Sequence, residues 1–172
     1  MSYQDTTYII FDGNNDKWAY ARMKGWKALE NIDFHFENAH DEYSLTSLAS
    51  NEEYVKGKLR KRFSTAKQVI VLIGDKTKNL YKYVRWELEI SQELKLPIIA
   101  VNLNGDRIQN DKTCPPIIKD TYVVHIPFRL KIIKYALDNF PPFFYKRENK
   151  TCIEGAIYPD SLYQSLGLNE KI

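Results

Sequence analysis

One carboxylate of this chain stands where a helix should present apolar side chains. The apolar stripe, read at helical spacing, comprises Tyr83, Trp86, Ile90 and Leu94. Glu87 falls inside this stripe, and a charge that faces a protein core needs an ion-pair partner, a proton or a cavity. A salt bridge to a nearby Arg or Lys would satisfy it, and so would a first-turn position stabilised by the helix dipole. Since we expect the helix to begin near residue 79 or 80, Glu87 lies beyond the first turn, which favours a pocket carboxylate.

Further polar side chains follow two apolar segments. Residues 12–16 read Asp-Gly-Asn-Asn-Asp and come directly after the first apolar segment, 7–11. Residues 75–79 follow Val-Ile-Val-Leu-Ile at 69–73 and Gly74. Asp12, Asn15 and Asp16 could bond the hydroxyl or amine groups of a ligand, but the same residue types also form turns and cap helices. Both interpretations are open for each of them.

The elements that must position these residues alternate along the chain. Apolar or alternating segments predict five β-strands, at residues 7–11, 33–37, 69–73, 97–103 and 122–126. Helical spacing of apolar residues predicts helices over 18–29, 51–66 and 80–94, and a last helix from 130 to 140 that is closed by Pro141-Pro142. Strands that alternate with helices indicate an α/β domain with a parallel sheet.

The strand patterns also predict the order of the sheet. Residues 33–37 alternate polar and apolar side chains, which is typical of an edge strand, whereas 7–11 and 69–73 are apolar enough to be central. This favours the flavodoxin-like order 2-1-3-4-5. Ligands of such sheets bind at the carboxyl ends of the strands, where the strand order reverses. The loops at 12–16 and 75–79 should therefore meet there, beside the helix that carries Glu87.

Composition limits the remaining possibilities. The 172 residues carry a formal net charge of +3 and only two cysteines, Cys114 and Cys152. We expect one domain over residues 1–140, a C-terminal extension over 141–172 that packs on it, no metal site and a reduced, cytoplasmic setting. No signal peptide or membrane-spanning segment is expected. The basic run at 56–61 is typical of a solvated helix face, so we expect no nucleic-acid partner.

Two other features have competing interpretations. The polar connection from Asn38 to Asn51 is long enough for a binding loop, but a surface loop would look the same. His125, inside the fifth strand, is expected to be a core or edge histidine whose hydrogen-bonding needs are met. The first strand lacks the glycine-rich loop of dinucleotide and Walker sites, and no nucleophile elbow or zinc-binding helix motif occurs.

Three segments together resemble a known family. Val69 to Gly74, then Tyr83-Val84-Arg85-Trp86-Glu87-Leu88, then Pro97 to Val101, are similar to bacterial TIR-like proteins, specifically the ThsB component of Thoeris anti-phage systems. Phe11-Asp12 and Asn15-Asp16 fit the same branch. The resemblance covers roughly Thr7 to Phe140, and its aromatic-Val-Arg-Trp-Glu motif is the specific part.

The resemblance implies a TIR fold and an enzyme that consumes NAD as its substrate, without a further cofactor. Such an enzyme breaks the nicotinamide–ribose bond and releases an ADP-ribose-derived messenger, cyclic or conjugated to an amine such as histidine. That messenger activates a partner effector after a phage-derived trigger. The family's catalytic glutamate maps onto Glu87. The expected binding residues are Phe11, Asp12, Asn15, Asp16, Asp75, Tyr83 and Trp86.

The motif differs from the family at Tyr83, where Trp is common. Assembly into a homo-oligomer is a further expectation from the resemblance. One alternative is a non-catalytic interaction module, in which Glu87 only makes a structural salt bridge. Another is a nucleotide sensor that binds its ligand without turnover.

Overall fold

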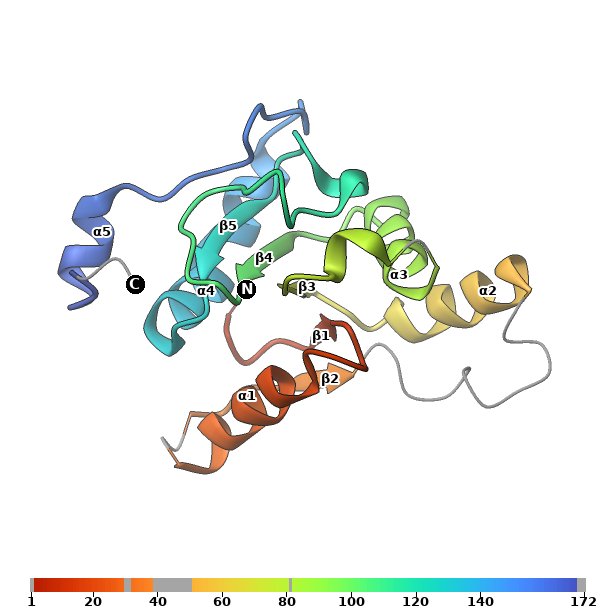
Figure 1. The fold of residues 1–172 in the computed structure, drawn as a ribbon, viewed down its shortest axis with the longest axis horizontal. Helices are drawn as coiled ribbons and strands as arrows, with labels where there is room; N and C mark the ends of the chain where they lie inside the picture. The colour runs from red at the N-terminus through yellow and green to blue at the C-terminus, as the bar shows by residue number, and fades with distance from the viewer. Residues whose placement is uncertain (1, 30–31, 39–50, 81, 170–172) are drawn as a thin grey trace.

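The fold is built on one five-stranded parallel sheet. The computed structural model describes residues 2–29, 32–38, 51–80 and 82–169 (Figure 1). The strands are β1 Thr7–Ile10, β2 Phe36–Asn38, β3 Gln68–Ile73, β4 Ile98–Asn102 and β5 Val124–Pro127. Their order is β2-β1-β3-β4-β5, and every neighbouring pair is parallel. The predicted α/β class, strand order and edge position of the second strand are confirmed.

Helices cover both faces of this sheet (Figure 1). They are α1 Lys17–Leu29, α2 Glu52–Phe63, α3 Tyr83–Glu93, α4 Leu130–Lys146 and α5 Asp160–Ser165, with short 3-10 turns η2 Thr77–Asn79 and η3 Pro116–Ile118. Side chains of α2 and α3 share one apolar cluster with Tyr8, Val69 and Ile98 of the sheet. Side chains of α1, α4 and α5 share the other, whose sheet residues include Ile9 and Ile70. Successive strand residues alternate between the two clusters because side chains along a strand point to opposite faces.

Three predicted boundaries differ from the structure. The second strand begins at Phe36 rather than 33 and the fifth at Val124 rather than 122. Before β5, the Tyr122 amide donates to the carbonyl of Lys150 in the C-terminal extension, so this residue is held by the extension and not by β4. Helix α3 begins at Tyr83 rather than near 80, because Thr77 closes a 3-10 turn by accepting from the Leu80 amide.

The last helix does not stop at Pro141-Pro142, as the sequence predicted, but continues through both prolines to Lys146. Each proline removes one helical N–H donor, which ordinarily ends or kinks a helix. Aromatic packing holds the final turns in place: the ring of Tyr122 lies 5.4 Å from that of Phe140 and 6.4 Å from that of Phe144. Burial of these rings on the sheet outweighs the lost hydrogen bonds.

The C-terminal extension packs on the domain. Residue Ala156 forms a parallel bridge with Val124 of β5, and the Tyr163 side chain of α5 is completely buried in the cluster beneath α4. The proposed division between residues 140 and 141 falls inside α4, and it stays a prediction.

Candidate active site

Glu87 lies in the second turn of α3 and is completely buried, with 0% of its surface exposed. It is the fifth residue of the helix, so stabilisation by the first-turn dipole does not explain it. The buried face of α3 differs from the predicted stripe. It includes Val84 and Leu88, because the helix packs against α2 as well as against the sheet, whereas Leu94 follows the helix and is exposed. A cavity of about 270 Å³ lies beside the first turn, where Val84 and Leu80 line it.

The loop after β1 is organised by Asp12. Its carboxylate accepts hydrogen bonds from the amides of Asn14 at 2.9 Å and Asn15 at 3.2 Å, and from the Asn15 side chain at 2.6 Å. The turn-forming interpretation therefore accounts for what Asp12 and Asn15 do here. Asn15 is exposed, so its side chain can exchange this bond for one to a ligand.

Asp16 joins the loop after β1 to the loop after β3, as the predicted strand order requires. Its carboxylate accepts a hydrogen bond from the Thr77 hydroxyl at 3.4 Å, and Thr77 in turn accepts from the Gly74 amide at 2.9 Å. A Cβ atom at Gly74 would lie 2.5 Å from the Asp16 carboxylate oxygens. Burial, followed by repulsion from Asp12 and Asp75, raises the pKa of Asp16. The two loops are therefore in contact, as predicted.

Sequence reasoning missed Thr77 and Gly74 as parts of this junction. The available signal was Gly74 itself, since glycine at the end of a buried strand permits close approach of another group. Asp75, which was expected to bind ligand, is exposed on the outer side of the same turn.

The predicted aromatic walls do not form one surface. Tyr83 and Trp86 contact each other edge to face at 5.5 Å and belong to the cluster on the α2 and α3 side of the sheet. Phe11 is buried in the opposite cluster, where it stacks on Tyr20 at 4.9 Å. Only Tyr83 and Trp86 thus share the face that carries Glu87, because residue 11 follows the alternation of β1 to the other side.

His125 differs from its predicted state. It is completely buried in β5, and among the described residues neither ring nitrogen has a hydrogen-bond partner. The extension lies directly on the ring, since a Cβ atom at Gly155 would be 2.6 Å from its Cδ2. Burial lowers the pKa of His125 to about 4, so the imidazole is neutral.

The candidate site residues are thus Asp12 and Asp16 at the carboxyl end of β1 and Glu87 on the helix that follows β3. Carboxylates can stabilise positive charge that develops on a bound molecule. Within the described ranges no group of His, Cys, Asp and Glu could hold a metal ion. Over the same ranges, no helix has the length and apolar character needed to cross a membrane. The connection at 39–50, where a binding loop was one expectation, lies outside the described residues.

A family model described as the TIR-like domain of the Thoeris protein ThsB matches residues 3–108. The match includes the first four strands and α3 with its motif, and it ends short of Phe140, where the sequence resemblance was expected to end. More than half of the chain is matched. This chain therefore belongs to the TIR-like domain family of the Thoeris protein ThsB, a defence-related TIR module.

Proposed function

We propose that this protein cleaves NAD at the nicotinamide–ribose bond, with Glu87 as the catalytic carboxylate. One observation carries the proposal: an acid with no exposed surface sits on the helix that follows the strand-order reversal of the sheet. Burying a carboxylate costs free energy. Buried carboxylates are therefore found often at functional sites, where their charge is used.

The chemistry needs a negative charge more than a strong acid. When the bond between the ribose C1′ and the pyridinium nitrogen breaks, its electron pair goes to nicotinamide, which leaves as a neutral molecule. Positive charge then develops on the ribose as an oxocarbenium ion, as in glycoside cleavage. A carboxylate held in a dry site stabilises that charge. Water, a ribose or adenine group, or an amine such as histidine then bonds to C1′ and loses a proton.

The other predicted binding residues take different roles in this proposal. Tyr83 and Trp86 share a face with Glu87 and offer aromatic surface to the nicotinamide ring. Asn15 is exposed next to Asp16 and can bond a ribose hydroxyl or the acceptor amine. Asp75 adds negative charge at the edge of the proposed NAD site. Phe11 acts only indirectly, by fixing the end of β1 from the opposite face.

Released ADP-ribose derivatives would carry the signal to a partner effector in phage defence. The trigger would be a phage-derived component, and self-assembly would complete the site. These steps follow from membership of the ThsB family and not from a contact in the chain.

Mass spectrometry of small molecules tests the proposal. NAD and its products are followed in phage-infected and uninfected cells that express the wild type, Glu87→Gln or the control Glu93→Gln. Glu93 lies on the same helix but forms a surface ion pair with Arg60 at 2.6 Å. We expect an ADP-ribose-containing species in infected wild-type and Glu93→Gln cells and none in Glu87→Gln cells.

Persistent NAD turnover by Glu87→Gln would refute the catalytic role. If NAD never changes in any of these cells while the wild type still protects against phage, the protein acts as an interaction module. Glu87→Gln should then alter stability or assembly.

A further inference from the structure

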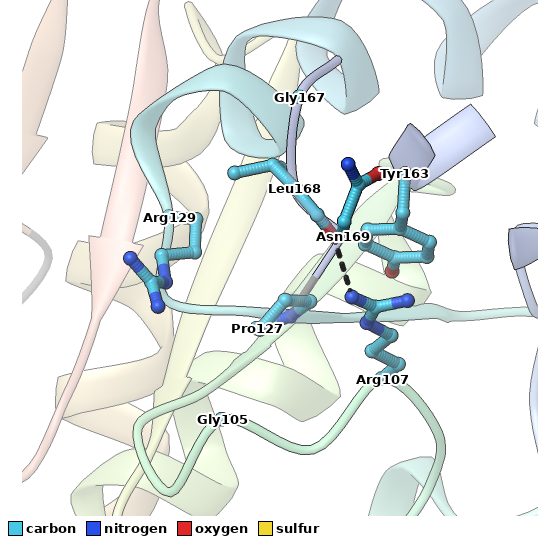
Figure 2. A pocket seen from close by; sticks show the side chains of 8 residues that line it. All are labelled: Gly105, Arg107, Pro127, Arg129, Tyr163, Gly167, Leu168 and Asn169. Carbon is cyan, nitrogen blue, oxygen red and sulfur yellow. Dashed lines mark hydrogen bonds between the residues drawn. The ribbon is translucent and has the colours of Figure 1, made fainter. Parts of the chain in front are cut away.

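Two adjoining hollows lie at the carboxyl end of β4 and β5, away from Glu87. The first, of about 260 Å³, is lined by Arg107, Arg129 and Tyr163 among others (Figure 2). The second, of about 490 Å³, is lined by Ile108 and Ile157 among others. Arg107 lines both, so the hollows share a wall. Together they reach the size range of sites for small organic ligands, roughly 300–1,000 Å³.

The first hollow is cationic. Arg129 caps the N-terminus of α4, and in the part of the chain that the structure describes its guanidinium group has no hydrogen bond or ion pair. The Lys131 ammonium lies 3.6 Å from the position of a Cβ atom at Gly167, on the rim. The opposing charges are Asp160, which is 3.2 Å from Arg107 and mostly exposed, and Asp106, and both line the second hollow. Three cations and the positive end of a 17-residue helix therefore lie beside two carboxylates.

Contacts with Tyr163 and Leu168 hold the Arg107 side chain in place. Its guanidinium group stacks on the Tyr163 ring at 4.0 Å and donates to the carbonyl of Leu168 at 2.7 Å. Figure 2 shows the Tyr163 hydroxyl on the side of Arg107. This hydroxyl is buried without a hydrogen-bond partner among the described residues, and burial raises the pKa of Tyr163 to about 12. The phenol keeps its proton and remains a donor at the base of the hollow.

The second hollow has an exposed apolar wall beside the carboxylates of Asp106 and Asp160. Ile108 is 52% exposed and Ile157 is 51% exposed, although they come from segments about fifty residues apart. Two large apolar side chains that flank one hollow resemble the walls of a ligand site more than scattered surface residues. Ile157 also lies outside the residues that match the ThsB family.

We propose that these hollows form one binding site for a nucleoside diphosphate. The phosphates bind Arg129 and Arg107 at the N-terminus of α4, and the base lies between Ile108 and Ile157. An anion alone would leave the isoleucines unused, and an apolar ligand alone would leave the cations unused. This site is separate from Glu87 and does not depend on the proposed NAD cleavage.

Isothermal titration calorimetry with three probes tests the site: ADP, adenosine and inorganic pyrophosphate. ADP should bind at least about tenfold more tightly than adenosine, since charge-assisted hydrogen bonds to phosphate add affinity. Arg129→Gln should weaken both ADP and pyrophosphate by roughly tenfold or more. Ile157→Asn should weaken ADP several-fold, on the order expected for one lost apolar contact, and leave pyrophosphate unchanged.

Matched variants control for general effects of charge and surface polarity. Arg22→Gln removes an exposed arginine of α1, and Ile153→Asn removes an isoleucine that is 81% exposed elsewhere on the extension. Both should bind ADP like the wild type, and so should Glu87→Gln. Of the five substituted positions in the two sets of variants, only Glu87 is buried and the other four are on the surface. Thermal denaturation verifies that each variant is folded.

Three results would overturn the proposal. ADP could fail to bind at concentrations of about 1 mM. It could bind equally well to wild type, Arg129→Gln and Ile157→Asn. It could also lose binding in Glu87→Gln alone, which would place the nucleotide at the Glu87 site instead.

Discussion

The two ends of the sheet's carboxyl edge carry opposite charges. At β1 and β3 the side chains are acidic, with Asp12 and Asp16 buried together and Glu87 buried on the helix that follows. At β4 and β5 the cavity is lined by basic residues, Arg107 and Arg129, while Asp106 and Asp160 line the adjoining hollow. An acidic site suits a reaction that develops positive charge, whereas a basic one suits a ligand that already carries negative charge. One parallel sheet thus carries two chemically distinct candidate sites at neighbouring strand ends.

The two ends also differ in what holds them together. The acidic end is closed by a carboxylate, Asp16, whose burial becomes less favourable as the pH rises. The region of β5 is closed by the C-terminal extension over His125, whose burial becomes less favourable as the pH falls. Substitutions at four positions test this difference between the two ends of the sheet.

The largest effect is expected at Glu87. Replacement by Gln keeps the shape of the side chain and removes its negative charge, so turnover of NAD should fall by about 10² to 10³, the usual loss of one electrostatic transition-state contact. The midpoint of thermal unfolding should change little in comparison. A loss of folding with no change in turnover per folded molecule would assign Glu87 to the structure rather than to the chemistry.

The next effect concerns His125. Its pKa is lowered from 6.5 to about 4 in the folded protein, so the unfolded chain binds the proton first as the pH falls. Stability should therefore be complete above pH 6.5 and decrease by roughly 3 kcal/mol towards pH 4. Urea unfolding at pH 7 and pH 4.5 measures this difference. His125→Leu should remove most of it, whereas His35→Leu, at an exposed position, should keep it.

A third variant tests the close approach at the acidic end. Gly74→Ala places a methyl group 2.5 Å from the Asp16 carboxylate, which should destabilise the fold by about 1–3 kcal/mol through overpacking. Gly57→Ala is the control, because nothing lies within 4 Å of that position and it is inside helix α2. That control should stabilise the protein by roughly 0.5–1 kcal/mol. Equal effects of the two variants would contradict the contact between Gly74 and Asp16.

The smallest effect is expected for Asp16→Asn. The pKa of Asp16 is raised above 3.8, so the folded protein loses stability as the pH rises from about 3.8 through the raised pKa, and the full cost is present at higher pH. Asn carries no charge and can still accept the Thr77 bond, so the variant should unfold at a higher temperature than wild type at pH 7 and show no gain at pH 3. Asp75→Asn removes only a repulsion and should give a smaller gain. A lower melting temperature for Asp16→Asn at pH 7 would show that the ionised form stabilises the loop junction.

Periodicity in the sequence was enough to predict the order of the sheet. Central and edge strands could be told apart by the unbroken apolar run of β3 and by the alternation of polar and apolar residues at 33–37. A strand buried on both faces is apolar throughout, whereas a strand buried on one face alternates. The meeting of the Asp16 loop with the loop after Gly74 followed from that order alone. Glu87 was recognised because a single carboxylate breaks an apolar stripe.

Element ends were predicted less well because distant contacts decide them. The two prolines predicted that α4 ends at Pro141. The ring of Tyr122 instead packs against Phe140 and Phe144, and the helix continues to Lys146. The expectation of a satisfied His125 failed for the same reason: the segment that covers it, at Gly155, is thirty residues away in the chain.

The α/β class, the strand order and the candidate carboxylate could all be predicted from the sequence, because each depends on the spacing of residues within segments. Which side chains share a face or a cavity was known only from the folded structure. It separated Phe11 from Tyr83 and Trp86, and it brought Arg107 onto Tyr163 across more than fifty residues. Such contacts depend on how whole elements pack, and no local pattern of residues specifies that packing.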